Sequence, residues 1–148
     1  GNLHGLMQFA AATPGLLVVP LVSRFKDQRG IAFSVSLLTV LSVIGLMLAP
    51  GFAILWTCLF GFSAGATLIL GLSFVSLRAA NSLQAAALSG MAQCIGYTLA
   101  AIGPTLIGMI HDAEGNWNAT LLICAGAAFM MAVLGLFAGR NLHIGAHA

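Results

Sequence analysis

One serine in the chain stands in a spacing that is typical of a catalytic nucleophile. Ser63 lies between Gly61 and Gly65 in a G-x-S-x-G pattern. In the nucleophile elbow such a serine sits on a strand-to-helix turn and works with a histidine. Here the pattern falls inside a long apolar run, and the four histidines lie near the ends of such runs. Glycines four residues apart also let membrane helices pack closely. We therefore expect Gly61 and Gly65 to be packing residues, with an intramembrane enzyme that uses Ser63 as the alternative.

The cysteines and the remaining histidines do not form a metal or redox motif. Cys58, Cys94 and Cys124 occur in separate apolar runs, without a C-x-x-C pair, and cysteines in apolar surroundings behave as small hydrophobic residues. His143 and His147 have a spacing that can bind a metal on a helix, but no further ligand stands near them. We expect no metal, no cofactor and no enzymatic activity.

A polar stripe inside one apolar run gives the strongest functional signal. The run from Leu88 to Ile110 carries no charge and is long enough to cross a bilayer as a helix. One face of that helix collects small and polar residues, namely Ser89, Gln93, Gly96, Tyr97, Ala100, Gly103 and Pro104. The opposite face collects Met91, Ile95, Leu99, Ile102 and Leu106. Such a helix turns its polar face to protein and its apolar face to lipid.

The polar stripe predicts a pathway for a solute. A polar group at membrane depth must be satisfied within the protein or by a substrate. We expect Gln8, in the first apolar run, to face a shared cavity with Gln93 and Tyr97. The other possibility is that these side chains only join helices by hydrogen bonds of about 0.6–2 kcal/mol each. Since Pro104 removes a backbone hydrogen bond, a kink is expected around Gly103 and Pro104.

Composition places the chain in a membrane. Hydrophobic residues make up 60% of it and charged residues 5%, whereas soluble proteins carry about 25% charged residues. The cations are scattered and form no basic patch, so nucleic acid is not an expected partner. An all-α membrane protein is predicted, with transmembrane helices at about residues 3–22, 31–49, 52–77, 88–110 and 119–137, and with a tail over 140–148.

The basic residues give these helices a direction. With five crossings, the connections after the first and third helices share one side of the membrane with the tail. All the cations fall on that side: Arg24, Lys26, Arg29, Arg78 and Arg140. Because such residues collect in cytoplasmic loops, a cytoplasmic C-terminus is predicted. Asp27 belongs to the same basic loop, while Asp112 and Glu114 fall on the other side, so no carboxylate is expected at membrane depth.

The chain resembles the C-terminal part of a major facilitator superfamily transporter, from its eighth helix to its twelfth. The resemblance is carried by the basic loop Arg24–Arg29, by the Gly103–Pro104 pair with Gly108, and by the block LSGMAQCIGYTLAAIGP followed by HDAEGNW. The last feature is similar to the cyanate and 2-nitroimidazole transporter branch. The basic loop departs from the Gly-x-x-x-Asp-Arg-x-Gly-Arg pattern of the family. Arg24 stands near the position of the expected Asp, so a gate built on that Asp is not carried over.

The resemblance implies a fragment of a secondary transporter that works by alternating access in the plasma (bacterial inner) membrane. Its expected partners are the lipid bilayer, the missing N-terminal half of the same transporter, and a small solute such as cyanate or a nitroimidazole. Two other hypotheses stay open. One is the intramembrane enzyme based on Ser63, and the other is a self-contained structural or channel subunit.

Overall fold

A computed structural model describes residues 1–25 and 27–140, and throughout these residues the regular structure is helical. The elements in chain order are α1 (Asn2–Ala12), α2 (Pro14–Arg24), α3 (Arg29–Leu48), the short 3₁₀ helix η1 (Pro50–Phe52), α4 (Ala53–Arg78), α5 (Ser82–Glu114) and α6 (Asn118–Ala138). Five stretches are long and apolar enough to cross a membrane. The expected all-α membrane fold is therefore confirmed. Lys26 and residues 141–148, with His143, His147 and most of the expected tail, lie outside the described residues.

The first crossing consists of two helices and not of the single helix expected over residues 3–22. Pro14 has no N–H group and cannot donate to the carbonyl oxygen of Ala10. Thr13 satisfies that oxygen instead, because its backbone N–H and its hydroxyl donate to it at 3.3 and 2.7 Å. A bilayer core offers no water to a free carbonyl, so this side-chain bond permits the break between α1 and α2 within the crossing.

α4 is the centre of the packed part of the molecule. It contacts α1, α2 and α3. α2 and the C-terminal half of α4 share a buried apolar cluster of Val18, Val22, Ala66 and Leu70. α1 passes α4 at Gly61 and Gly65, where an added Cβ would collide with the carbonyl oxygens of Met7 and Ala11. The two glycines therefore allow the two helix backbones to touch.

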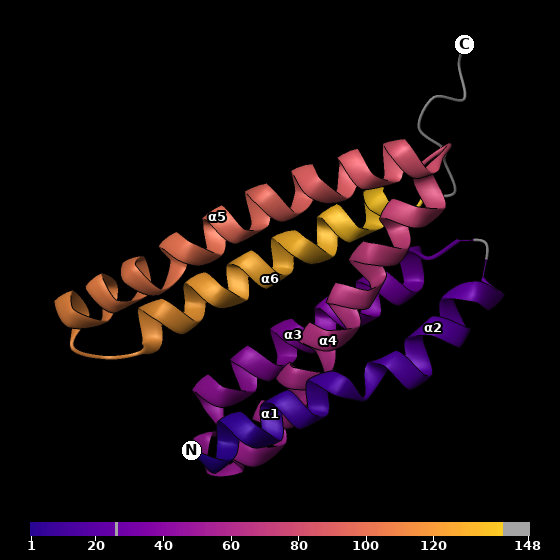
Figure 1. The fold of residues 1–148 in the computed structure, drawn as a ribbon. Coiled ribbons are helices and arrows are strands. Elements are labelled where there is room, and N and C mark those ends of the chain that lie inside the picture. The colour runs from indigo at the N-terminus through magenta and orange to yellow at the C-terminus, as the bar shows by residue number, and fades with distance from the viewer. Residues whose placement is uncertain (26, 141–148) are drawn as a thin grey trace.

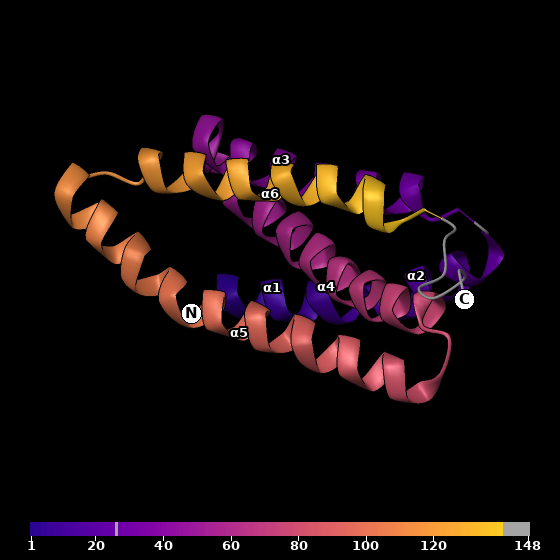
Figure 2. The same cartoon turned by 90° about the horizontal axis from the view of Figure 1, so that it is seen from above.

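A second close contact joins α3 to α6, which lie side by side in both views (Figures 1 and 2). A Cβ on Gly135 would lie 3.3 Å from the Cβ of Ala32, and one on Gly139 would lie 2.8 Å from the backbone nitrogen of Arg29. Small residues thus set both main helix contacts of the bundle. The end of α6 is held against the start of α3 by this packing.

α5 differs from its neighbours because it has no buried residue. It is joined to α4 by a short turn at Ala79–Asn81 and contacts α4 and α6 only sparsely. Figure 2 shows α5 along one edge of the molecule. α5 continues through Pro104 as one helix, and its ribbon bends along its length (Figure 2). That the bend is caused by Pro104 stays a prediction.

α5 is also longer than the expected helix over 88–110. Asn81 caps its start, since the side-chain oxygen accepts a hydrogen bond from the backbone N–H of Gln84 at 2.9 Å. The side chain of Gln84 accepts from the N–H of Ala80, the residue before the cap, at 3.0 Å, one residue earlier than in a capping box. At the other end Gly115 adopts a left-handed φ of 65° and donates to the carbonyl of His111. Residues 111–114, which lie beyond the expected helix over 88–110, are thus helical.

Candidate functional site

The polar stripe of α5 faces α4 across a groove of about 570 Å³. α4 contributes Thr67, Leu68, Gly71, Leu72 and Val75 to it, and α5 contributes Ser89, Ala92, Gln93, Gly96, Tyr97 and Ala100. The two walls differ in chemistry, because the α4 wall is almost entirely apolar and the α5 wall carries an amide and two hydroxyls. Most of the stripe predicted from helical spacing therefore lines a single groove.

Gln93 and Tyr97 supply the free hydrogen-bonding groups of this groove. Gln93 donates from its amide nitrogen to the hydroxyl of Ser89 at 3.0 Å, which leaves its amide oxygen to accept from a solute. The Tyr97 side chain is 71% exposed. On the facing wall the hydroxyl of Thr67 donates to the carbonyl of Ser63 within its own helix at 2.9 Å. The groove can thus bind a solute through one amide and one phenol, without a fixed charge.

Gln8 is not part of this groove. It lies on α1 with an exposed side chain, and α1 packs on α4 through the face that includes Met7 and Ala11. Gln93 and Tyr97 line the same groove, and Gln8 is not among its lining residues. A role for Gln8 in a cavity shared with other segments stays a prediction.

The other glycines predicted on α5 have no close neighbour. Gly96 lines the groove, and a Cβ added at Gly96 or at Gly103 would meet no atom within 4 Å. Their small size is therefore not required by packing among the described residues. Gly96 and Gly103 thus differ from Gly61 and Gly65, which touch the backbone of α1.

Ser63 lies in the middle of α4 and not on a strand-to-helix turn. Its side chain is fully buried, and its hydroxyl donates to the carbonyl of Phe60 at 3.0 Å. A hydroxyl that bonds back to its own helix is a common way for serine to be satisfied in an apolar helix. This arrangement lacks the exposed Oγ that a nucleophile elbow requires.

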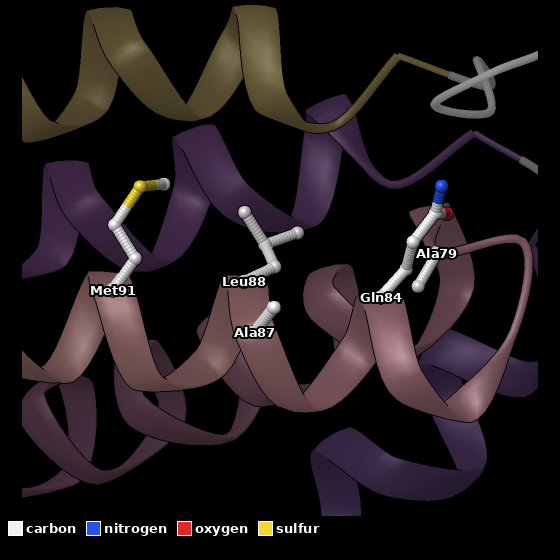
Figure 3. Close-up of a pocket in the computed structure, with 5 residues that line it drawn as sticks. All are labelled: Ala79, Gln84, Ala87, Leu88 and Met91. Carbon is white, nitrogen blue, oxygen red and sulfur yellow. The ribbon is translucent and has the colours of Figure 1, made fainter.

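A smaller pocket of about 250 Å³ lies beside the start of α5. Figure 3 shows its lining residues Ala79, Gln84, Ala87, Leu88 and Met91, with the long side chains of Gln84, Leu88 and Met91 rising from the same side of the helix. Gln84 is the only one with a polar side chain, and its amide oxygen is already bound to the N–H of Ala80. This pocket therefore offers little to a polar ligand.

One end of the bundle is basic. Arg24, Arg29, Arg78 and Arg140 all lie at this end, where α2, α4 and α6 finish and α3 begins (Figure 1). Asp27 pairs with Arg29 there, with 3.6 Å between Oδ2 and Nε. Arg78 was predicted only as a loop cation, but it is buried. Its burial had no sequence signal, because its partners come from distant segments.

The described residues contain no group of three or more His, Cys, Asp or Glu side chains that could hold a metal ion. Cys58, Cys94 and Cys124 are free. At the end of α5, the ring of His111 stacks on the ring of Trp117 from the turn that follows, with 3.9 Å between their centroids. These side chains lie at the end opposite the basic residues.

Comparison with known proteins points to transport. No family model matches the chain, and no solved structure matches it. Over 97% of its length the chain is 55% identical to the 2-nitroimidazole transporter of Escherichia coli (strain K12), of which it covers 37%. Over 74% of its length it is 50% identical to a putative anionic 4-hydroxy-benzoate permease of Thauera aromatica, of which it covers 66%.

A third relative is an uncharacterized transporter of Bacillus subtilis (strain 168). It is 35% identical over 97% of the chain, which spans 36% of its length. All three relatives are thus named as transporters or permeases, and in each the matched part is shorter than the whole protein. The chain is homologous to a segment of proteins that are named as transporters or permeases.

Proposed function

We propose that the chain forms helices eight to twelve of a major facilitator transporter, which moves a small solute across the plasma (bacterial inner) membrane by alternating access. The groove between α4 and α5 carries this proposal, because it places Gln93 and Tyr97 on one wall of a space large enough for a small organic molecule. Ligand sites of this kind are mostly apolar with a few placed polar groups. In this role the chain acts by binding and conformational change and not by catalysis.

The proposed solute is a small aromatic ring with polar substituents. The names of two relatives mention 2-nitroimidazole and 4-hydroxy-benzoate, and both are planar rings of this kind. Apolar side chains such as Leu68 and Leu72 suit the faces of a ring, while the amide of Gln93 and the phenol of Tyr97 suit its polar edge. Cyanate would use only a small fraction of the groove.

The open groove between α4 and α5 supports a partner that covers its open side. Polar groups such as those of Gln93 and Tyr97 cannot face lipid without cost. In the proposed transporter the N-terminal half packs against this side, and the solute binds between the halves near the midplane of the membrane. The basic end, with Arg24 and Arg140, would then face the cytoplasm. Asp27, Asp112 and Glu114 lie near helix ends, so a proton-coupling group would come from the other half.

The test is uptake of 2-nitroimidazole by cells that produce the intact protein. Gln93→Leu and Tyr97→Phe each remove one groove hydrogen bond and should lower uptake about 5- to 13-fold, since such bonds contribute about 1–1.5 kcal/mol. Thr98→Val is the matched control. Thr98 neighbours Tyr97, but its hydroxyl bonds to the carbonyl of Cys94 on its own helix at 2.8 Å, so uptake should stay at the wild-type level.

Protein amount in the membrane is measured for each variant. Wild-type uptake kinetics in both groove variants would remove Gln93 and Tyr97 from the solute pathway. An equal loss of uptake in Thr98→Val would show that uptake falls with any substitution in this part of α5. The loss in the groove variants would then not come from their groove side chains.

A further inference from the structure

Arg78, the last residue of α4, is buried at the basic end with only 8% of its surface exposed. Its Nη2 donates to the side-chain oxygen of Gln28 at 2.9 Å and to the carbonyl oxygen of Gly139 at 3.2 Å. Gln28 is buried as well, and its amide nitrogen donates to the carbonyl of Phe25 at 2.6 Å. The guanidinium therefore ties together the α2–α3 connection, the end of α4 and the end of α6.

The charge of this guanidinium is not balanced by the residues around it. Both hydrogen-bond acceptors are neutral, and its Nε is buried without any acceptor. The ring of Phe74, 5.9 Å from the guanidinium carbon, presents a face but no acceptor. Among the described residues the only ion pair is that of Asp27 with Arg29. Arginine keeps its charge in proteins, and a buried charge without a counter-ion is costly.

Two more arginines lie around the same point. Arg140 directly follows Gly139, and the backbone nitrogen of Arg29 lies 2.8 Å from the position of a Cβ on Gly139. Arg29 and Arg140 both have exposed side chains. We call Arg29, Arg78 and Arg140 the arginine cluster. Among the residues that the structure describes, Asp27 is the only carboxylate at this end, so the arginine cluster has a net positive charge.

We infer that the arginine cluster binds the phosphate group of an anionic phospholipid. The planar guanidinium suits a phosphate because two parallel N–H groups can donate to two of its oxygens. In Arg78 the side-chain oxygen of Gln28 takes one such position next to the unsatisfied Nε. A phosphate that displaced the Gln28 oxygen would accept from both N–H groups, with one oxygen on Nη2 and another on Nε.

Exposed aromatic rings beside the cluster favour a lipid over a carboxylate side chain. The side chains of Phe25 and Phe137 are 53% and 57% exposed. Phe25 adjoins the site through the bond from Gln28, and the ring of Phe137 lies 4.8 Å below the guanidinium carbon of Arg140. A phospholipid would place its phosphate on the arginines and its acyl chain against these rings. A carboxylate would use the arginines and leave the rings without a role.

The experiment titrates the intact, detergent-purified protein with short-chain phosphatidylglycerol and follows the midpoint of thermal unfolding. Short-chain phosphatidylcholine and inorganic phosphate are titrated in separate arms. We expect a saturable rise with phosphatidylglycerol alone. Arg78→Gln should abolish the rise. Arg140→Gln should raise the half-saturating concentration about fivefold, since one arginine near anionic lipid contributes about 1 kcal/mol.

Arg24→Gln is the matched control, because Arg24 is an exposed arginine at the end of α2, at the same end of the bundle, and is not a member of the arginine cluster. It should leave the half-saturating concentration unchanged. Equal weakening in Arg24→Gln and Arg140→Gln would mean general charge attraction and would overturn the site. The same rise with inorganic phosphate would assign a free anion instead of a lipid.

Absence of a saturable rise in the wild type would overturn the proposal in favour of a carboxylate from elsewhere in the protein. If Arg78→Gln does not fold, Arg140→Gln carries the test, because that position is exposed. All readouts are lipid binding and unfolding, so the result is independent of the proposed solute transport.

Discussion

α4 and α5 are both long apolar helices, yet they are used in opposite ways. α4 buries Gly61, Ser63, Ala66, Leu70 and Arg78, while α5 buries none of its residues. Glycine shows the contrast best. Gly65 of α4 touches the backbone of α1, whereas a Cβ on Gly90 of α5 would meet nothing within 4 Å. The two helices thus differ in whether their small residues meet a neighbouring backbone.

The contrast predicts its largest effect at Gly65. In Gly65→Ala the new methyl group collides with the carbonyl oxygen of Ala11, and a backbone atom cannot rotate out of the way as a side chain can. α1 must move away from α4, so we expect a loss of about 1–3 kcal/mol in the free energy of unfolding. Reversible unfolding of the intact protein in detergent measures this loss.

Gly90→Ala is the matched control on α5. It adds the same methyl group in open space, and alanine is a better helix former than glycine by about 1 kcal/mol. Its free energy of unfolding should be unchanged or higher. Equal destabilisation of the two variants would break the comparison between α4 and α5.

A second, smaller effect is expected at the start of α5. Asn81→Ala removes the bond from the side-chain oxygen to the N–H of Gln84, and loss of such a cap costs about 0.5–2 kcal/mol. Because α5 packs little, the loss should stay local. Hydrogen exchange should accelerate several-fold in the first turns of α5 and remain unchanged in α3. A matching drop in global stability would instead show that α5 folds as one unit with the rest.

The smallest effect is expected at Ser63. Ser63→Ala removes a hydroxyl that is bonded only to the carbonyl of Phe60 in its own helix, so no buried donor loses its partner. We expect a change below about 1 kcal/mol in the free energy of unfolding and unchanged uptake of 2-nitroimidazole. Abolished uptake at wild-type stability would contradict this expectation and would give the Ser63 hydroxyl a role in function beyond its bond to Phe60.

The number and approximate location of the crossings could be predicted from the sequence because lipid requires long uninterrupted apolar helices. Two features that the expected helix bounds do not include also have local signals in the sequence. Thr13 before Pro14 marks the break in the first crossing, and Asn81 followed by Gln84 marks the start of α5. Both are side-chain bonds to nearby backbone, which sequence spacing can reveal.

The candidate site was predictable only within one helix. Helical spacing placed Gln93 and Tyr97 on one wall, but it could not say that α4 forms the other wall or that Gln8 lies elsewhere. Arg78 illustrates the same limit. Its acceptor carbonyl belongs to Gly139, 61 residues further along the chain, and no local pattern connects the two.

The length of α5 has a consequence for the membrane in which the protein sits. Its 33 residues correspond to about 50 Å of helix, while the hydrocarbon core of a bilayer is about 30 Å thick. A tilt that fitted the whole helix into that core would be about 50°, which exceeds the range of roughly 0–40° seen for membrane helices. The turns around Gln84, with their polar cap, therefore extend beyond the core into the headgroup layer. The 20 residues of α3 match about 30 Å without surplus. α3 thus fixes the depth of the protein, whereas α5 can accommodate bilayers of different thickness.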